Sequence, residues 1–314
     1  MIPVILALPA FIIGIVLLWK GSDILVESTS KTAVQLGIST LIISTLLVGF
    51  GTSAPEFAVS VGAAIQKNSD ISLGNIIGSC VANLLLVLGV AALVRPIKIN
   101  KGIIRREYPI MLGATVVFLL SSYFGLLDTN HWIGGIVFLI LFAIFITYFI
   151  ICVKNERNNR KKIDVGKIHK NIVFMILGIL GVVAGAWLLI DSSVTIAEYL
   201  GISLFIISIT MVAVGTSVPE LVVSSMAAYK KESDIAVGNV LGSNVFNILL
   251  IIGFAALFIP LKATASLDHL LILLGVTFVM FPILFTGQVI SRREGVLMIV
   301  IYSFFIWYIF FSLL

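Results

Sequence analysis

Two copies of one short motif each place a glutamate beside a proline within apolar sequence. Residues Gly51 to Glu56 read GTSAPE and residues Gly215 to Glu220 read GTSVPE, so the two glutamates lie 164 positions apart. An ionisable side chain at bilayer depth is costly, and where one occurs it usually has a function. Two such side chains at matched positions predict a single functional site built from both copies.

A second polar block follows each motif at the same distance. Residues 70–83 read DISLGNIIGSCVAN, and residues 234–247 read DIAVGNVLGSNVFN. At this fixed offset, 10 of the 17 residues from Asp70 to Leu86 are identical to their partners. The chain therefore contains an internal repeat, and each half is expected to supply half of the site.

The first motif predicts a broken helix with exposed oxygen ligands. Pro55 has no N–H, and its ring clashes with the carbonyl of Gly51, so the helix should kink or break there. Carbonyls freed at membrane depth are tolerated where they line a cavity, and there they can bind a cation. Thr52 and Glu56 are four residues apart and share a helix face, and Ser53 can reach the same cavity from its flank.

The polar blocks add a second set of ligands with the same spacing. Ser79 and Asn83 are four residues apart, as are Ser243 and Asn247, so each pair shares a helix face. Every side chain in the combined set offers oxygen, which suits Ca²⁺ or Na⁺ and not zinc or copper. The candidate ligands are Thr52, Ser53, Glu56, Ser79, Asn83, Thr216, Ser217, Glu220, Ser243 and Asn247.

Two further repeated features have simpler interpretations. A pair of glycines four residues apart allows neighbouring helices to approach closely, which would bring the Ser/Asn face against the broken helix. An asparagine between them can hydrogen-bond the broken backbone instead of touching an ion, so it is left outside the ligand set. The glycines are Gly74 and Gly78 with Gly238 and Gly242, and the asparagines are Asn75 and Asn239.

The composition indicates an all-α integral membrane protein. Hydrophobic residues make up 60% of the 314 residues and charged residues 11%, compared with about 25% charged residues in soluble domains. Apolar runs of roughly the 20 residues that a spanning helix needs recur from end to end. We expect ten transmembrane helices, over 3–19, 40–66, 70–94, 108–124, 132–153, 171–190, 204–229, 234–259, 267–286 and 295–314.

The basic residues predict an orientation and give no indication of nucleic-acid binding. With the N-terminus outside, 18 of the 20 Lys and Arg residues fall in cytoplasmic loops, and only Lys67 and Lys262 do not, as the positive-inside rule requires. We therefore expect a multi-pass protein of the cytoplasmic membrane with both termini extracytoplasmic. The polar loop 154–170 would be a cytoplasmic connector between two five-helix repeats, 1–153 and 171–314. A second interpretation of its basic run is contact with lipid headgroups.

The position of the motifs determines how the two halves are related. Equivalent motifs lie five spans apart, so they must cross the membrane in opposite directions. The expected fold is therefore two inverted five-helix repeats with broken core helices, the architecture of secondary transporters, in which the substrate site lies near the midplane. One Ca²⁺ or two Na⁺ would neutralise two ionised glutamates, and a third Na⁺ would make the exchange electrogenic.

The repeated motifs resemble those of the cation/Ca²⁺ exchanger superfamily, and within it the prokaryotic sodium/calcium exchangers. The resemblance is carried by GTSAPE and GTSVPE, each followed by GN-x-x-GS-x-x-x-N at 74–83 and 238–247, and it covers essentially the whole chain. It implies exchange of extracellular Na⁺ for cytoplasmic Ca²⁺ by a protein that is not an enzyme and carries no cofactor. We expect the chain to function as a monomer.

The resemblance also implies roles for individual residues. In the family, four ion sites form a diamond around two glutamates, here Glu56 and Glu220. The motif threonines would add hydroxyl and carbonyl oxygens, the four serines would flank the outer Na⁺ sites, and the two asparagines would close the middle. The backbone carbonyls of Gly49 and Ala213 are further candidates. Alternating access is expected to involve sliding of the first and sixth helices.

Several alternatives remain open at this point. Potassium-dependent exchangers have Asp where this chain has Asn247, which argues against K⁺ co-transport. The nearest rival is an antiporter of the same fold coupled to H⁺ or carrying another divalent cation, since a buried glutamate can take up protons. A cation channel would need a continuous pore, which inverted halves disfavour. An intramembrane enzyme using the glutamates as acid and base lacks further catalytic groups.

Overall fold

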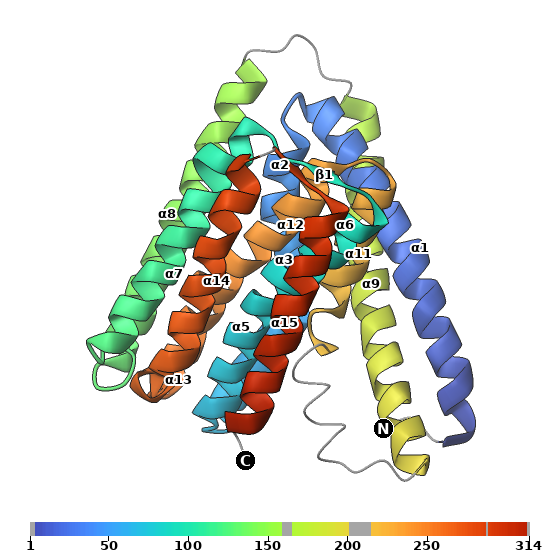
Figure 1. Ribbon diagram of the computed structural model, residues 1–314. Helices are drawn as coiled ribbons and strands as arrows, with labels where there is room; N and C mark the ends of the chain where they lie inside the picture. Colours follow the sequence, from blue (N-terminus) through green and yellow to red (C-terminus); the bar gives the residue numbers. More distant parts are fainter. Residues whose placement is uncertain (1–3, 159–164, 201–214, 287, 313–314) are drawn as a thin grey trace.

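The computed structural model describes residues 4–158, 165–200, 215–286 and 288–312, and nearly all of them are helical (Figure 1). The start of α1 and the end of α15 lie at the lower end of this view, whereas the end of α8 and the start of α9 lie at the upper end. The α-helices are α1 (Val4–Leu36), α2 (Thr40–Ile43), α3 (Gly49–Thr52), α4 (Ala54–Ile65), α5 (Ser69–Ala82), α6 (Leu88–Val94), α7 (Tyr108–Tyr123), α8 (His131–Asn158), α9 (Val165–Tyr199), α11 (Val218–Tyr229), α12 (Ser233–Val245), α13 (Ile252–Phe258), α14 (Leu267–Thr286) and α15 (Arg292–Ser312).

Shorter elements join or interrupt these helices. A two-stranded antiparallel ribbon pairs Ile97 with Ile290 and so links the two halves of the sequence. The short elements are β1 (Ile97–Lys98), β2 (Val289–Ile290), the π-helical turns η1 (Ser44–Val48), η2 (Asn83–Val87), η3 (Ile103–Glu107) and η5 (Phe246–Ile251), and the 3₁₀ turn η6 (Ala263–Ser266).

The described helices confirm a helical membrane protein. Six of them are long and apolar enough to cross a membrane, or seven when the bent pair Thr40–Thr52 and Ala54–Ile65 is counted as one span. Residues 108–123 of one expected run form α7, and residues 295–312 of another lie in α15. Of the expected run 204–229, residues 204–214 lie outside the described part of the chain, and α11 accounts for most of the remainder.

The first and sixth expected helices are longer than their apolar runs. Helix α1 continues beyond residue 19 to Leu36, so Lys20 and Lys31, which were expected in a loop, lie inside a helix. The run 171–190 likewise lies within the 35-residue helix α9. Hydropathy marks only the part of a helix that lies in lipid, and a polar continuation can stay helical because water satisfies its side chains. A pair four residues apart, Lys31 with Glu27, supports it.

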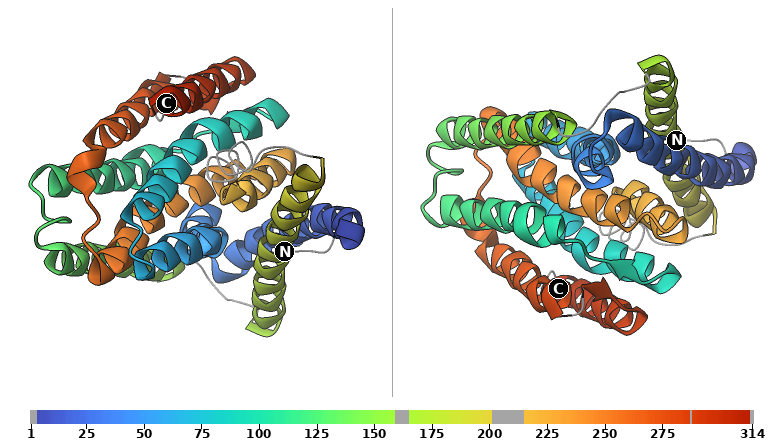
Figure 2. Two further views of the ribbon diagram at one scale, coloured as in Figure 1. Left: turned by 90° about the horizontal axis from the view of Figure 1, so that it is seen from below. Right: turned by 90° about the horizontal axis from the view of Figure 1, so that it is seen from above.

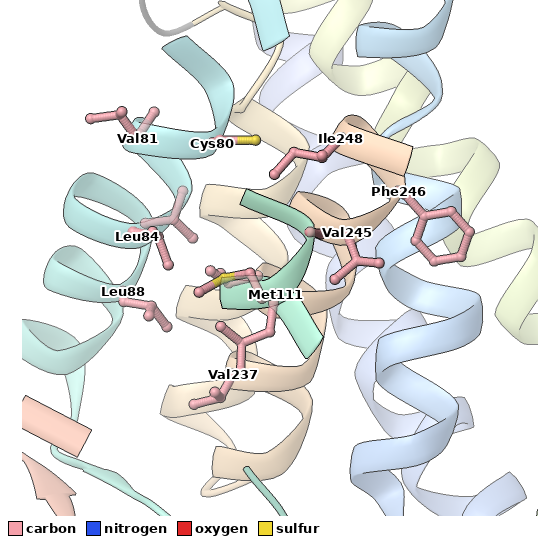
Figure 3. Packing of buried hydrophobic residues seen from close by; sticks show 14 of the residues in the cluster. Cys80, Val81, Leu84, Leu88, Met111, Val237, Val245, Phe246 and Ile248 are labelled. Carbon is pink, nitrogen blue, oxygen red and sulfur yellow. The ribbon is translucent and has the colours of Figure 1, made fainter. Parts of the chain in front are cut away.

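Two composite spans form the centre of the bundle. In an apolar 18-residue window of each span, 78% of Ser69–Val94 and 83% of Ser233–Phe258 is buried, compared with 22% of α1 and 17% of His131–Glu156. Seen from either end of the bundle, α1 and α9 lie on the side away from α7 and α8 (Figure 2). The central spans pack through aliphatic side chains, and Figure 3 shows Met111 of α7 among Leu84, Leu88 and Val237.

Glycines let particular helix pairs approach to backbone contact. A Cβ added at Gly242 would lie 2.3 Å from the carbonyl oxygen of Thr45, and one at Gly238 would lie 2.0 Å from the hydroxyl of Ser44. The predicted close approach is thus confirmed for the second glycine pair. For Gly74 and Gly78 a Cβ would meet nothing within 4 Å among the described residues, and the segment equivalent to residues 41–45 in the repeat, 205–209, lies outside them.

Glycines also bring α1 and α9 into close contact. A Cβ at Gly185 would lie 2.7 Å from the backbone nitrogen of Leu18 and 2.9 Å from the carbonyl of Gly14. A Cβ at Gly178 would lie 2.8 Å from the Cβ of Leu25. The two long helices therefore touch backbone to backbone over more than one turn. They form a pair attached to the side of the buried core.

This contact predicts that Gly185→Ala destabilises the protein. The added methyl group meets immobile backbone, and overpacking of this kind costs about 1–3 kcal/mol. The matched control is Gly113→Ala on α7, where no described residue lies within 4 Å of the new Cβ. Thermal unfolding in detergent should show a lower midpoint for Gly185→Ala and an unchanged or higher one for Gly113→Ala. Equal midpoints for both variants would contradict the packing described.

Candidate cation-binding site

The helix that carries Glu56 is broken at the motif, as predicted. α3 ends at Thr52, α4 begins at Ala54, and the two parts of the span are bent by 48°. Ser53 between them leaves helical geometry, with φ −79° and ψ 6°. Pro55 occupies the first turn of α4, where its missing N–H is no loss. Glu56 therefore lies in the first turn of a new helix.

The second motif repeats this geometry. Ser217 precedes α11 with φ −85° and ψ 5°, and both Pro219 and Glu220 lie in the first turn of α11. The hydroxyls of Ser53 and Ser217 stand at the N-cap position without capping their helices, which leaves them available to the site. The expected carbonyl ligand Ala213 lies outside the described residues.

Both carboxylates are fully buried. Glu56 and Glu220 are each 0% exposed, and they lie close enough to repel each other when ionised. Each is at a helix N-terminus, where the helix dipole favours negative charge by about 0.3–1 kcal/mol. That is small compared with the several kcal/mol needed to bury an ion, so the pair must either bind a cation or take up protons.

Hydroxyls from both copies surround Glu220. Its Oε1 accepts a hydrogen bond from Ser243 at 3.2 Å and from Ser53 of the other copy at 3.4 Å. The Ser243 hydroxyl also lies 3.1 Å from the carbonyl of Gly49, the backbone oxygen that was expected to act as a ligand. Thr52 lies 3.3 Å from Ser243. One half of the site is thus built across the repeat boundary.

The surroundings of Glu56 resemble those of Glu220, although among the described residues no hydrogen bond reaches a carboxylate oxygen of Glu56. The hydroxyls of Ser79 and Thr216 lie 3.1 Å apart, and both face the Glu56 carboxylate. Ser79 comes from the same copy as Glu56, and Thr216 comes from the other copy. Around Glu220, Ser243 likewise comes from the same copy and Thr52 from the other. The structure therefore brings both serine and threonine pairs to the two carboxylates.

The predicted asparagines lie on π-helical turns. Asn83 begins η2 and Asn247 lies in η5, and both are 0% exposed. Such turns are rare and often occur at functional sites. Asn83 donates to Asn244 at 3.0 Å, whereas the amide of Asn247 lies beside the thiol of Cys80. The two predicted asparagines therefore have different neighbours, although their sequence positions are equivalent.

Buried polar atoms without partners gather at this site. Among the described residues, no hydrogen bond reaches either oxygen of Glu56, Oε2 of Glu220, Oδ1 of Asn83 or the amide of Asn247. A buried polar group without a partner costs about 1–3 kcal/mol, and most of these atoms are oxygens able to ligate a cation. In the same part of the chain, no group of three or more His, Cys, Asp or Glu side chains is placed to hold a metal ion.

One feature of the site was not predicted from the sequence. Asn244 replaces Cys80 in the repeat and donates to the Cys80 carbonyl at 3.1 Å, and a position that differs between the copies gives no repeat signal. The expectation for Asn75 and Asn239 is confirmed, because they donate hydrogen bonds to the backbone carbonyls of Glu56 and Glu220.

Comparison with known proteins identifies the family. The model of the sodium/calcium exchanger protein family matches residues 6–151 and 170–311. The chain belongs to the sodium/calcium exchanger family. Its relatives include the sodium/calcium exchanger MaX1 of Methanosarcina acetivorans, which is 35% identical over 94% of this chain and 96% of the relative. The inner membrane protein YrbG of Escherichia coli is 33% identical over 82% of this chain and 81% of that protein.

The fold is also that of a solved exchanger. The structure of the sodium-calcium exchanger NCX_Mj soaked with 10 mM Na⁺ and zero Ca²⁺ matches with a TM-score of 0.84 at 32% identity, over 96% of this chain and 98% of that one. Structures of NCX_Mj soaked with Na⁺ and Sr²⁺ match at TM-scores that include 0.82 and 0.84. The family to which the motifs pointed is thus confirmed.

The unpartnered amide at Asn247 leads to a prediction about stability. Asn247→Leu should keep or raise the unfolding temperature without Ca²⁺, because an apolar side chain removes an unsatisfied polar group, and it should reduce the rise in unfolding temperature on adding Ca²⁺. The control is Asn244→Leu, which breaks the bonds to Cys80 and Asn83 and should lower the ion-free unfolding temperature. A full Ca²⁺-dependent rise in Asn247→Leu would remove this residue from the site.

Proposed function

We propose that this family member is a secondary-active antiporter that exchanges Na⁺ for Ca²⁺ at the site between Glu56 and Glu220. The observation that carries the proposal is the pair of fully buried carboxylates, each faced by hydroxyls from both copies of the repeat. The other proposed ligands are Thr52, Ser53, Ser79, Asn83, Thr216, Ser217, Ser243 and Asn247.

The charge of this site supports alternate occupation. Two carboxylates are neutralised by one Ca²⁺ or by two Na⁺, so either cargo relieves their mutual repulsion and the two compete for the same oxygens. About six to eight oxygen ligands satisfy Ca²⁺, and the site offers enough hydroxyl, carboxylate, amide and carbonyl oxygens. A third Na⁺ on neutral oxygens would make each cycle electrogenic. Since all ten proposed ligands come from one chain, the monomer is the proposed transport unit.

The repeat supports ten transmembrane helices in two inverted halves, 1–153 and 171–314, with a connector over 154–170. Equivalent breaks precede α4 and α11, and equivalent π-helical turns follow α5 and α12. In Figure 1, α5 begins at the lower end of the bundle, whereas its repeat partner α12 begins at the upper end beside β1. This antiparallel relation is what inverted repeats require, and transporters of this kind bind substrate where the repeats meet.

A cavity on one side of the site supports alternating access. It measures about 730 Å³, is lined by α4 and the second half of α9, and reaches Thr216. The repeat maps α4 and α9 onto α11 and α1, which pack against each other. Val59 on the cavity is 40% exposed, whereas its partner Val223 is 0% exposed. Beside α11, Lys230 binds Asp23 of α1 at 2.7 Å. We propose that the two routes open in turn as α1 and α9 slide.

The charge distribution supports an orientation. The end of α8, the start of α9 and the β1–β2 ribbon lie at the upper end in Figure 1, and most Lys and Arg residues cluster in sequence around these elements. The positive-inside rule then makes this end cytoplasmic, with both termini outside and the chain in the cytoplasmic membrane. The inward Na⁺ gradient would drive Ca²⁺ out of the cell, and the basic connector would face anionic lipid headgroups.

The proposal predicts Na⁺-dependent Ca²⁺ uptake into proteoliposomes. Vesicles loaded with Na⁺ should take up Ca²⁺ when diluted into Na⁺-free buffer, whereas vesicles loaded with K⁺ or carrying only a proton gradient should not. Glu56→Gln and Glu220→Gln should each lower the rate by at least about a hundredfold, a loss of about 2.7 kcal/mol or more, because each removes half of the negative charge that binds the cation. Unchanged elution on size exclusion would show that these variants fold.

Three results would contradict it. Uptake that proceeds equally without Na⁺ inside would indicate a channel. Uptake driven by the proton gradient alone would indicate the H⁺-coupled antiporter of the same fold. Activity at the wild-type rate in either glutamine variant would exclude that glutamate from the site.

A further inference from the structure

Asn75 makes three hydrogen bonds that connect the two copies of the repeat. It is 1% exposed. Its Nδ2 donates to the hydroxyl of Ser60 at 2.8 Å and to the backbone carbonyl of Glu56 at 3.4 Å. Its Oδ1 accepts from the hydroxyl of Thr216 at 3.1 Å. One side chain thus bonds the glutamate backbone of its own copy and the threonine of the other.

Asn239 makes the equivalent three bonds. It is 0% exposed, and its Nδ2 donates to Ser224 at 3.0 Å and to the carbonyl of Glu220 at 3.5 Å. Its Oδ1 accepts from the hydroxyl of Thr52 at 2.9 Å. Every atom pair repeats at the 164-residue offset, including the serines. Because the pattern crosses between copies, packing within one half does not account for it.

The asparagine amide sets the direction in which each threonine hydroxyl points its proton. A hydroxyl has one proton and two lone pairs, and an asparagine oxygen can only accept. Thr52 Oγ1 lies nearer to Asn239 Oδ1 (2.9 Å) than to the carbonyls of Val48 (3.1 Å) and Gly49 (3.4 Å). With the proton directed at the amide, the lone pairs are free for the cavity, which is what a cation ligand requires.

We infer that Asn75 and Asn239 are positioning residues that orient the threonine ligand of the opposite copy and tie it to the glutamate of their own. They act on the ion through Thr216 and Thr52 and do not touch it themselves. The inference rests on the proposed function, because it assigns these threonines as ligands. Its consequence is that the threonine ligand of each copy is held in place by an asparagine of the other copy.

A double-mutant cycle tests this inference. The measured quantity is the Ca²⁺ concentration for half-maximal Na⁺-driven uptake into proteoliposomes. Asn239→Leu and Thr52→Val should each raise it about tenfold, and the double variant should still show about a tenfold rise, because residues in direct contact are not additive. The matched control combines Asn239→Leu with Thr216→Val. Thr216 bonds Asn75 and not Asn239, so the two effects should multiply to about a hundredfold rise.

The outcomes separate this inference from the proposed function. An additive, about hundredfold rise in Asn239→Leu with Thr52→Val would overturn the inference while leaving exchange intact. Absence of Na⁺-driven uptake in the wild type would overturn the proposed function itself. The mirrored cycle of Asn75→Leu with Thr216→Val provides a second test should Asn239→Leu fail to fold. Unfolding of both leucine variants would assign the asparagines a purely structural role and also overturn the inference.

Discussion

Burying two like charges in the centre of a membrane protein is the constraint on which the rest of this structure depends. Glu56 and Glu220 are inaccessible to solvent and repel each other, and the helix N-termini beneath them offset only a small part of that energy. The helix breaks, the hydroxyls from opposite copies and the unpartnered asparagine amide are all explained by one requirement, which is a place for a mobile cation. A site of this kind is stable when filled and unfavourable when empty.

The candidate site is shared between the two copies of the repeat. Neither copy completes a half-site, because Ser53 reaches Glu220 and Thr216 faces Glu56. In the proposed mechanism, the cargo is held at the boundary between the copies, and the routes to it run along helices that the repeat relates. At present the sides differ, with a cavity beside α4 and α9 and close packing of α11 against α1. If α11 and α1 separated while α4 and α9 closed, the site would become accessible from the opposite side without a continuous pore.

Much of the candidate site was predictable from the sequence because its ligand motif occurs twice in the chain. The motif and its partner identified the ten candidate ligands, the break at Pro55 and the family. Other features were beyond the sequence. The extension of α1 past residue 19 was missed, because hydropathy reports lipid contact and not helicity. The bond between Asn83 and Asn244 was missed because the copies differ at Asn244 and Cys80, so no repeat signal existed. The direction of the Asn75 and Asn239 bonds, across the copies, required three-dimensional placement.

The central claim is that one site between the two glutamates holds either Ca²⁺ or Na⁺. Calorimetric titration of the purified protein with Ca²⁺, repeated at increasing Na⁺ concentration, tests it most directly. The account predicts one Ca²⁺ per chain and an apparent dissociation constant that rises at least with the square of the Na⁺ concentration, since two or more Na⁺ must leave before Ca²⁺ enters. A Ca²⁺ affinity that does not change with Na⁺, or a second Ca²⁺ bound alongside the first, would contradict it.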